Sequence, residues 1–167
     1  MRTIYCDMDG VLSNFNARYE TMFKKKPSEV ARNGKEGEYS KSWNTFIDSR
    51  QFSTLEKMED ADELINFLKS IATIGKARVA ILSSTGGFDR HNNVMIQKRI
   101  WLENRGINWP FVFVPGRRFK AGYADKYSLM IDDTFDVIES FQKNGGTAIH
   151  HKDAKTTIEQ IKQWMEV

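Results

Sequence analysis

Five short runs of mostly apolar residues recur along the chain, and longer segments with one apolar stripe lie between them. The runs are largely continuous instead of alternating, which is typical of parallel strands covered on both faces. Strands that alternate with helices predict an α/β fold, Rossmann-like, with a parallel five-stranded sheet between two helical layers. The predicted strands are Arg2–Cys6, Arg78–Leu82, Phe111–Val114, Leu129–Ile131 and Thr147–Ile149.

Helical periodicity is clear in residues 60–75, where apolar side chains recur every three or four positions. Residues 90–106 repeat the pattern, with Val94, Ile100 and Trp101 on one predicted face and a glycine at the end. Further helices are predicted at residues 11–23, 134–146 and 153–167.

The connection between the first two strands is much longer than one crossover helix needs. Roughly 70 residues separate Cys6 from Arg78, and the helix at 60–75 accounts only for the return to the sheet. Residues 16–55 are therefore expected to form a small helical cap. The core domain would then comprise residues 1–15 and 56–167.

Composition adds limits to this picture. The chain has 167 residues, 40% of them hydrophobic and 28% charged, as expected for one globular domain with a real core. A net charge of +3 favours anionic ligands but lacks the clustered basic footprint of most nucleic-acid-binding proteins. The single cysteine, Cys6, excludes an internal disulfide and a Cys-based zinc site, and its apolar neighbours predict a buried side chain.

The sequence contains neither a signal-peptide pattern at its start nor an apolar run of membrane-spanning length. We therefore expect a cytoplasmic protein with no membrane partner.

The first predicted strand ends in two carboxylates, in the stretch IYCDMDGVL. Side chains alternate along an extended backbone, so Asp7 and Asp9 point the same way, at the strand end where α/β proteins bind ligands. Two like charges so placed persist only if a cation or a protonation arrangement relieves their repulsion, and oxygen ligands beside a substrate suit Mg²⁺. A simple Asp-Gly turn is the alternative, but a helix and not a returning strand follows Gly10.

Polar groups follow two other predicted strands. In SLMIDDTF, Asp132 and Asp133 end an apolar run, although aspartate at that place can also cap a helix. In VAILSSTGG, Ser83 or Ser84 could donate to an anion, or simply form a turn. Residues 116–127 add arginine and lysine beside the second acidic pair. All these groups fall at one edge of the sheet, which favours a shared site over coincidence.

Together these motifs resemble the haloacid dehalogenase (HAD) superfamily of phosphohydrolases: DMDGVL, then ILSS, then a lysine, then IDD. The segments DMDGVLSNF, SSTGG…KRIWLE and LMIDD are most similar to the 5′(3′)-deoxyribonucleotidase branch. Asn14 departs from that branch, which commonly has an aspartate before the phenylalanine. The resemblance implies a phosphomonoesterase with an aspartyl-phosphate intermediate, and a 5′-nucleotidase acting on nucleoside monophosphates.

The resemblance also implies roles for individual residues. Asp7 would be the nucleophile, and Asp9 would protonate the leaving group and then activate water. Ser83 and a lysine would neutralise the phosphoryl oxygens. The lysine of the resembling branch lies about ten residues before the acidic pair, which favours Lys120 over Lys126. The implied Mg²⁺ ligands are Asp7, the Asp9 backbone carbonyl and the acidic pair Asp132 and Asp133, with Asp133 the first choice for direct contact.

Substrate contacts are expected from the cap and from the strand ends. Phe15, Trp43 and Phe46 are candidates for stacking on a base, while Trp43 and Phe46 could equally form the core of the cap. Further candidates for phosphate or substrate contacts are Gly10, Ser84, Arg117, Arg118 and Lys126.

Other functions remain open. A phosphatase for nucleic-acid ends would use the same chemistry, as would a phosphatase for another small molecule. A non-enzymatic phosphoacceptor domain also combines carboxylates, a hydroxyl and a lysine, but the strand ending FVFVPG lacks the acceptor aspartate of such domains. A binding-only relative and a homodimer are further possibilities.

Overall fold

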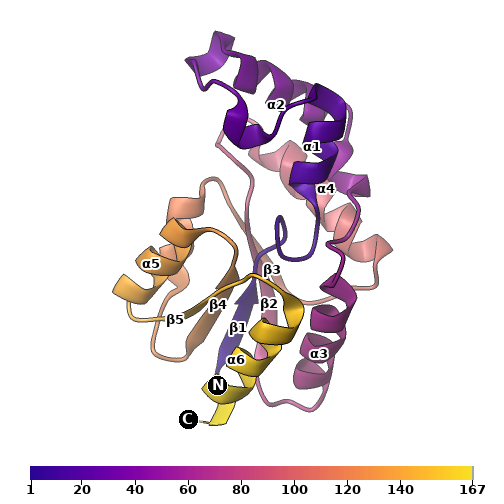
Figure 1. Ribbon diagram of the computed structural model, residues 1–167. Coiled ribbons are helices and arrows are strands. Elements are labelled where there is room, and N and C mark those ends of the chain that lie inside the picture. Colours follow the sequence, from indigo (N-terminus) through magenta and orange to yellow (C-terminus); the bar gives the residue numbers. More distant parts are fainter. Residues whose placement is uncertain (167) are drawn as a thin grey trace.

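A computed structural model, which describes residues 1–166, shows a parallel five-stranded sheet with the order β3-β2-β1-β4-β5 (Figure 1). All five predicted strands are present, each within two residues of its predicted ends, and the α/β prediction is confirmed. Strand β1 lies at the centre, paired with β2 and β4. The strands are β1 (Thr3–Cys6), β2 (Arg78–Ser84), β3 (Phe111–Val114), β4 (Ser128–Asp132) and β5 (Thr147–His150).

The predicted helices are also present. Those expected at residues 60–75, 90–106, 134–146 and 153–167 form α3 (Ala61–Thr73), α4 (His91–Asn104), α5 (Phe135–Lys143) and α6 (Ala154–Glu166). Val167, the last residue of the fourth prediction, lies outside the described residues. The remaining helical elements are α1 (Phe15–Phe23), α2 (Glu38–Asp48) and the 3-10 turns η1 (Pro27–Glu29), η2 (Gly34–Glu36), η3 (Gln51–Thr54) and η4 (Arg117–Tyr123).

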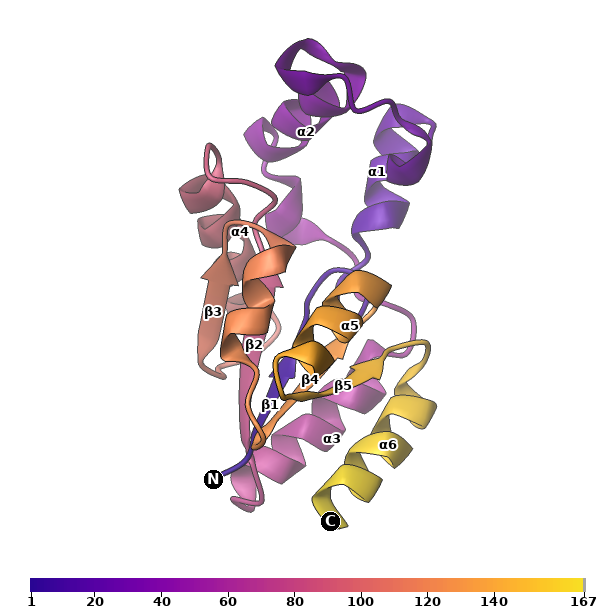
Figure 2. The ribbon, with the colours of Figure 1, turned by 90° about the vertical axis from the view of Figure 1, so that its left-hand side faces the viewer.

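Alternate residues of each strand enter two separate cores. On one face, Ile4 and Cys6 of β1 join the apolar side chains of α3, α4 and α6. On the other face, Met130 of β4 packs with Phe141 of α5 and with Tyr5. Helices α3 and α6 pack against each other on the first face (Figure 2). Burial on both sides explains why the strands are continuous apolar runs.

Cys6 is fully buried, as expected, and burial raises the pKa of its thiol. The side chain acts as a small apolar residue of the core.

Two details differ from the predictions. The helix expected at 11–23 begins only at Phe15, because the Met8 carbonyl accepts hydrogen bonds in a tight turn first, including one from Leu12 N at 2.7 Å. Asn14 then caps the helix by accepting a hydrogen bond from the backbone of Ala17. On α4, Ile100 is exposed instead of buried, and the buried face carries two polar side chains, Gln97 and Lys98.

The elements from α1 to η3 rise above the sheet at the carboxyl ends of its strands (Figures 1 and 2). We call residues 15–54 the cap segment. Its buried aromatic side chains, such as Tyr19 and Phe52, belong to the same apolar cluster as β1 and α3. The division into two domains at residues 16 and 55 stays a prediction.

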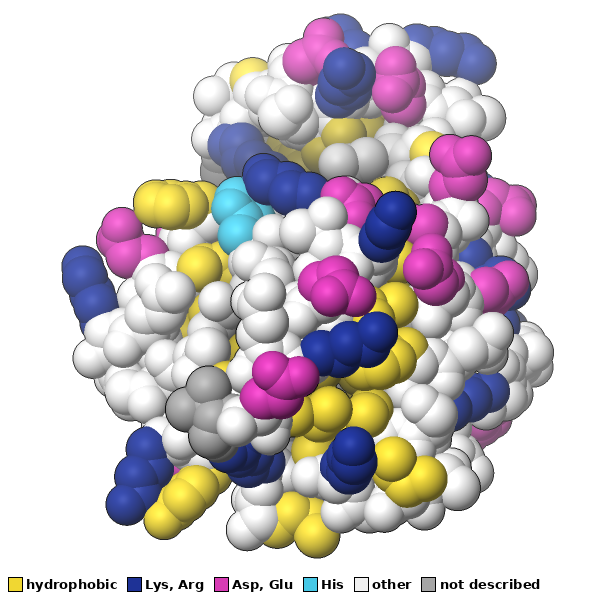
Figure 3. All heavy atoms as spheres, turned by 60° about the horizontal axis from the view of Figure 1, so that its bottom comes forward, with side chains coloured by type: hydrophobic (Ala, Val, Ile, Leu, Met, Phe, Trp, Pro, Cys, Tyr) yellow, Lys and Arg dark blue, Asp and Glu magenta, His cyan; other side chains and the backbone are white. Residues whose placement is uncertain are grey.

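Charges of both signs are interspersed on the face that Figure 3 shows. None of the described helices is long and apolar enough to cross a membrane.

Candidate active site

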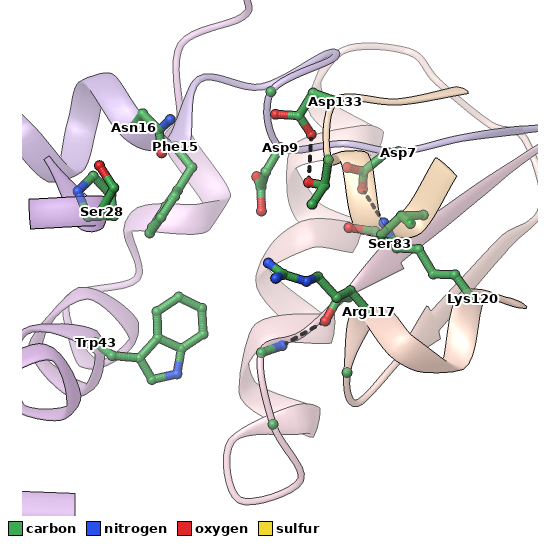
Figure 4. A pocket seen from close by; sticks show the side chains of 18 of the residues that line it. Asp7, Asp9, Phe15, Asn16, Ser28, Trp43, Ser83, Arg117, Lys120 and Asp133 are labelled. Atoms are coloured by element: carbon green, nitrogen blue, oxygen red, sulfur yellow. Dashed lines mark hydrogen bonds and ion pairs between the residues drawn. The ribbon is translucent and has the colours of Figure 1, made fainter. Parts of the chain in front are cut away.

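A cavity of about 1010 Å³ lies between the cap segment and the carboxyl ends of the strands. Sequence positions as distant as Asp7 and Asp133 meet there (Figure 4). The sequence-predicted residues that line it are Asp7, Asp9, Gly10, Phe15, Trp43, Ser83, Ser84, Arg117, Arg118, Lys120 and Asp133. Three others, Asp132, Phe46 and Lys126, are not among the lining residues.

The acidic cluster forms because β1 and β4 are neighbours in register. Cys6 pairs with Ile131, which brings the following residues, Asp7 and Asp132, level with each other. Carboxylate oxygens of Asp7, Asp132 and Asp133 lie within 4.8 Å of one another.

Crowding of buried carboxylates disfavours their charged form. Burial, followed by repulsion from Asp132, raises the pKa of Asp7 to about 7. Burial, followed by the charge of Asp7, raises the pKa of Asp133 to about 6. A cation placed among them would relieve this cost.

The donor set fits Mg²⁺, which prefers a few carboxylate oxygens beside room for water and phosphate. Asp7 and Asp133 line the cavity and face it, so they are the carboxylates best placed to hold the ion. Asp132 is fully buried, and its oxygens accept hydrogen bonds from Lys120 Nζ at 2.7 Å and Thr134 N at 2.9 Å. Asp132 therefore contributes charge and also fixes Lys120.

Gly10 lets the Asp133 carboxylate lie against the turn that follows β1. Its backbone has a positive φ of 85°, and a Cβ atom there would overlap the Asp133 carboxylate. A glycine is therefore required at this turn for both reasons.

Lys120 reaches the site from η4. Its Nζ lies 3.1 Å from Asp7 Oδ1 and 2.7 Å from Asp132 Oδ2, and its side chain is almost completely buried. Burial lowers the pKa of Lys120, but the two carboxylates outweigh burial and raise it. Lys126 lies elsewhere, with its Nζ 5.0 Å from the ring centre of Tyr127. The structure thus brings Lys120 to the acidic cluster and leaves Lys126 outside.

A second buried lysine, Lys98, was missed in the sequence. It is 2% exposed, and its Nζ donates to Asp9 Oδ2 at 2.9 Å and to Ser83 Oγ at 2.8 Å. Asp9 also accepts a hydrogen bond from Ser13 Oγ. Because Ser83 Oγ accepts from the lysine, its own proton is free to point into the cavity. The helical periodicity could have predicted this burial, because Lys98 lies between Val94 and Trp101 on the face of α4 that the pattern predicts to be buried.

Aromatic side chains form the wall opposite the acids. Figure 4 shows Phe15 and Trp43 across the cavity from Asp7 and Asp9. Phe46 was a candidate either for base stacking or for the core of the cap, and it is fully buried behind Phe15, with the ring centres 5.0 Å apart. Phe46 faces inward because α2 packs that side on α1, so it belongs to the core of the cap segment. Trp43 lies directly against Gly86, where a Cβ would clash with the indole.

Two arginines of η4 line the cavity. Arg117 projects into it (Figure 4), while its Nε donates to Asp136 at 2.9 Å. Arg118 lies over the ring of Phe119, 4.6 Å from its centre. Ser84 turns its Oγ to the backbone N–H of Gly86.

No family model matches this sequence, and no curated protein sequence matches it. Solved structures, however, share its fold over nearly the whole chain. D,D-heptose 1,7-bisphosphate phosphatase from Burkholderia thailandensis has a TM-score of 0.54 at 9% identity, covering 97% of this chain and 99% of that one. A hydrolase from Streptococcus pneumoniae has a TM-score of 0.53 at 15% identity, covering 99% and 98%.

The HAD domain of effector protein Lem4 from Legionella pneumophila has a TM-score of 0.50 at 14% identity, covering 97% of this chain and 94% of that one. At identities this low, the likeness shows the fold alone. This chain has the HAD-like α/β fold, as the resemblance of its motifs led us to expect.

Proposed function

We propose that this protein is a Mg²⁺-dependent phosphomonoesterase that works through an aspartyl-phosphate intermediate. The observation that carries the proposal is the meeting of Asp7 and Asp9 with Asp133 and Lys120 at one cavity. The four residues lie on three different connections of the fold, yet their charged ends converge. The fold is shared with a phosphatase and another hydrolase, which supports the same class of reaction.

In the first step a carboxylate oxygen of Asp7 attacks phosphorus, and the bond from phosphorus to the leaving oxygen breaks. Asp9 donates the proton that this oxygen takes up. In the second step Asp9 accepts a proton from the water that attacks the aspartyl-phosphate, which releases inorganic phosphate and restores Asp7. Lys120 and the Ser83 hydroxyl neutralise the phosphoryl oxygens. Bound Mg²⁺ supplies further positive charge at that group.

For the substrate we propose a small phosphate ester, with a nucleoside monophosphate as the first candidate. The aromatic wall of Phe15 and Trp43 is supporting evidence, because planar bases stack on such rings. A phosphatase for nucleic-acid ends is the second candidate. The cavity lining favours the smaller ligand, because its basic residues alternate with acidic ones such as Asp9 and Glu20, whereas strand binding normally uses a continuous basic groove.

The proposed activity is tested with a generic aryl phosphate in the presence of Mg²⁺. Wild-type protein is expected to hydrolyse it, and Asp7→Asn to lose turnover by roughly 10³-fold or more. Asp62→Asn, which neutralises an exposed carboxylate of α3, is the control and is expected to retain full activity. Mass spectrometry after acid quenching should show one added phosphoryl group on wild-type protein alone.

Wild-type protein that becomes phosphorylated without turnover would instead be a phosphoacceptor module. Absence of both phosphorylation and turnover would leave a binding protein and end the proposal. Comparison of a mononucleotide with a 5′-phosphorylated oligonucleotide then separates the two substrate candidates.

A further inference from the structure

The cavity wall that Phe15 and Trp43 form continues with further residues of the cap segment. Trp43 and Tyr39 of α2 are stacked, with ring centres 6.1 Å apart and an angle of 15° between their planes. The guanidinium carbon of Arg32 lies over the ring of Tyr39, 3.6 Å from its centre. All three residues line the same cavity as Asp7 and Asp9.

The charge of Arg32 has no carboxylate partner among residues 1–166. Arg18 pairs with Glu56 and Arg90 with Asp48, whereas Arg50, which also has no carboxylate partner among the described residues, does not line the cavity. Stacking on Tyr39 orients the Arg32 guanidinium but leaves its N–H groups able to donate.

The surroundings of Arg32 are also suited to an anion. Lys26 and Ser28 line the cavity from the same segment, and Glu20 is the only acidic lining residue among the described positions 15–54. The scissile phosphate has its own partners in Lys120, Ser83 and the metal ligands. The cavity volume lies at the upper end of the range for small-molecule sites, which is roughly 300–1,000 Å³. It therefore leaves room for a ligand that reaches from the carboxylates to the arginine.

We propose that Arg32, oriented by Tyr39, binds a second anionic group of the substrate. The substrate class is then a phosphate ester that carries another phosphate or a carboxylate at the end away from Asp7. A guanidinium suits this role because its planar N–H groups bind such oxygens in pairs. This inference rests on the proposed phosphatase function and narrows its substrate.

The test compares ligands that differ only in the second anionic group. A nucleoside 3′,5′-bisphosphate is assayed beside its 5′- and 3′-monophosphates, and fructose 1,6-bisphosphate beside both fructose monophosphates. At least one bisphosphate is expected to have the lower KM. Arg32→Gln should raise that KM on the order of tenfold, and should change the KM of the monophosphates much less.

Two variants serve as controls. Lys35→Gln removes the same charge from the cap segment at a residue that does not line the cavity, and should change neither KM. Tyr39→Phe keeps the stacking and should retain the preference, whereas Tyr39→Leu should weaken it. Equal KM values for bisphosphates and monophosphates in wild-type protein, or an Arg32→Gln variant with unaltered preference, would overturn the inference.

Failure of the proposed phosphatase function is separately visible, as absence of aryl phosphate hydrolysis. In that case binding of the same ligands to Asp7→Asn protein is measured by calorimetry. A bisphosphate should bind more tightly than its monophosphates, and lose this advantage when Arg32→Gln is added. Equal binding would refute the second anion site independently of catalysis.

Discussion

At the scale of single residues, the candidate site is a set of charges that hold one another in place. Lys120 forms ion pairs with both Asp7 and Asp132, and Lys98 donates hydrogen bonds to both Asp9 and Ser83. Among the described residues, no buried side-chain nitrogen or oxygen atom lacks a hydrogen-bond partner. Removal of one partner therefore leaves a buried charge or dipole unpaired, which costs more than the interaction itself contributes.

Exchange of Lys120 tests which lysine serves the phosphoryl group. Lys120→Ala removes a buried cation next to Asp7, and we expect turnover of an aryl phosphate to fall about 10²–10³-fold. Lys126→Ala is the matched control, since that lysine lies outside the cavity lining, and should retain near-normal turnover. Steady-state kinetics on folded protein, verified by circular dichroism, make the comparison. Near-normal turnover in Lys120→Ala with loss in Lys126→Ala would reverse the assignment.

At the scale of elements, helix α4 delivers a charged group through a face that otherwise packs in the core. Val94 and Trp101 anchor the helix in the apolar cluster, and Gln97 accepts a hydrogen bond from Phe52 N through its side-chain oxygen. The position of Lys98 is thus set by the packing of a whole helix. The Asp9 carboxylate, 28% exposed, depends on that position for its orientation.

Replacement of Lys98 by methionine keeps the volume of the side chain and removes its charge. We expect kcat for an aryl phosphate to fall on the order of 10²-fold, because a misplaced general acid costs about that much. KM should change little, since Lys98 touches Asp9 and Ser83 but is not itself a cavity-lining residue. Arg99→Met, one position along on the exposed side of α4, is the control and should leave both constants unchanged.

The leaving group adds a readout that a loss of packing alone would not give. An alkyl phosphate, whose leaving oxygen depends more on a donated proton than that of an aryl phosphate, should lose more kcat in Lys98→Met. A variant with normal kcat for both substrates would show that Lys98 is a structural residue only.

At the scale of the whole molecule, the acidic cluster links stability to pH and to metal. Asp7 and Asp133 have pKa values of about 7 and about 6 in the folded protein, above the ordinary value for aspartate. Between about pH 4 and pH 7 the folded state therefore binds more protons than the unfolded state. The contribution of these two groups to the free energy of unfolding accordingly decreases as pH rises through that window.

Under the proposed function, Mg²⁺ should reverse this loss, because the ion would bind the deprotonated carboxylates of the folded state. We expect Mg²⁺ to raise the free energy of unfolding clearly at about pH 8 and much less at about pH 5. Chemical denaturation with Mg²⁺ and with a chelator measures the difference. Other groups, such as the buried His151 with its lowered pKa, titrate alike with Mg²⁺ and with chelator, so their contributions cancel in the difference between the two free energies of unfolding. Equal stabilisation at both pH values would argue against a metal site at Asp7 and Asp133.

The sequence by itself determined the strands of the sheet, most of the helices that cover it and the chemistry of the strand ends. Apolar runs marked all five strands because both faces of the sheet are buried, and residues at alternate positions of an extended chain must share a side, as Asp7 and Asp9 do. Local spacing was enough for these features, since strand and helix periodicity depend only on near neighbours.

Only the tertiary structure decided which distant groups meet. The pairing of β1 with β4 brought Asp133 against Gly10, and the packing of α4 turned Lys98 inward and Ile100 outward. The fold likewise buried Phe46 and left Arg32 facing the cavity, although both lie on the cap segment. Such choices depend on contacts between residues far apart in the chain, which the local pattern does not contain.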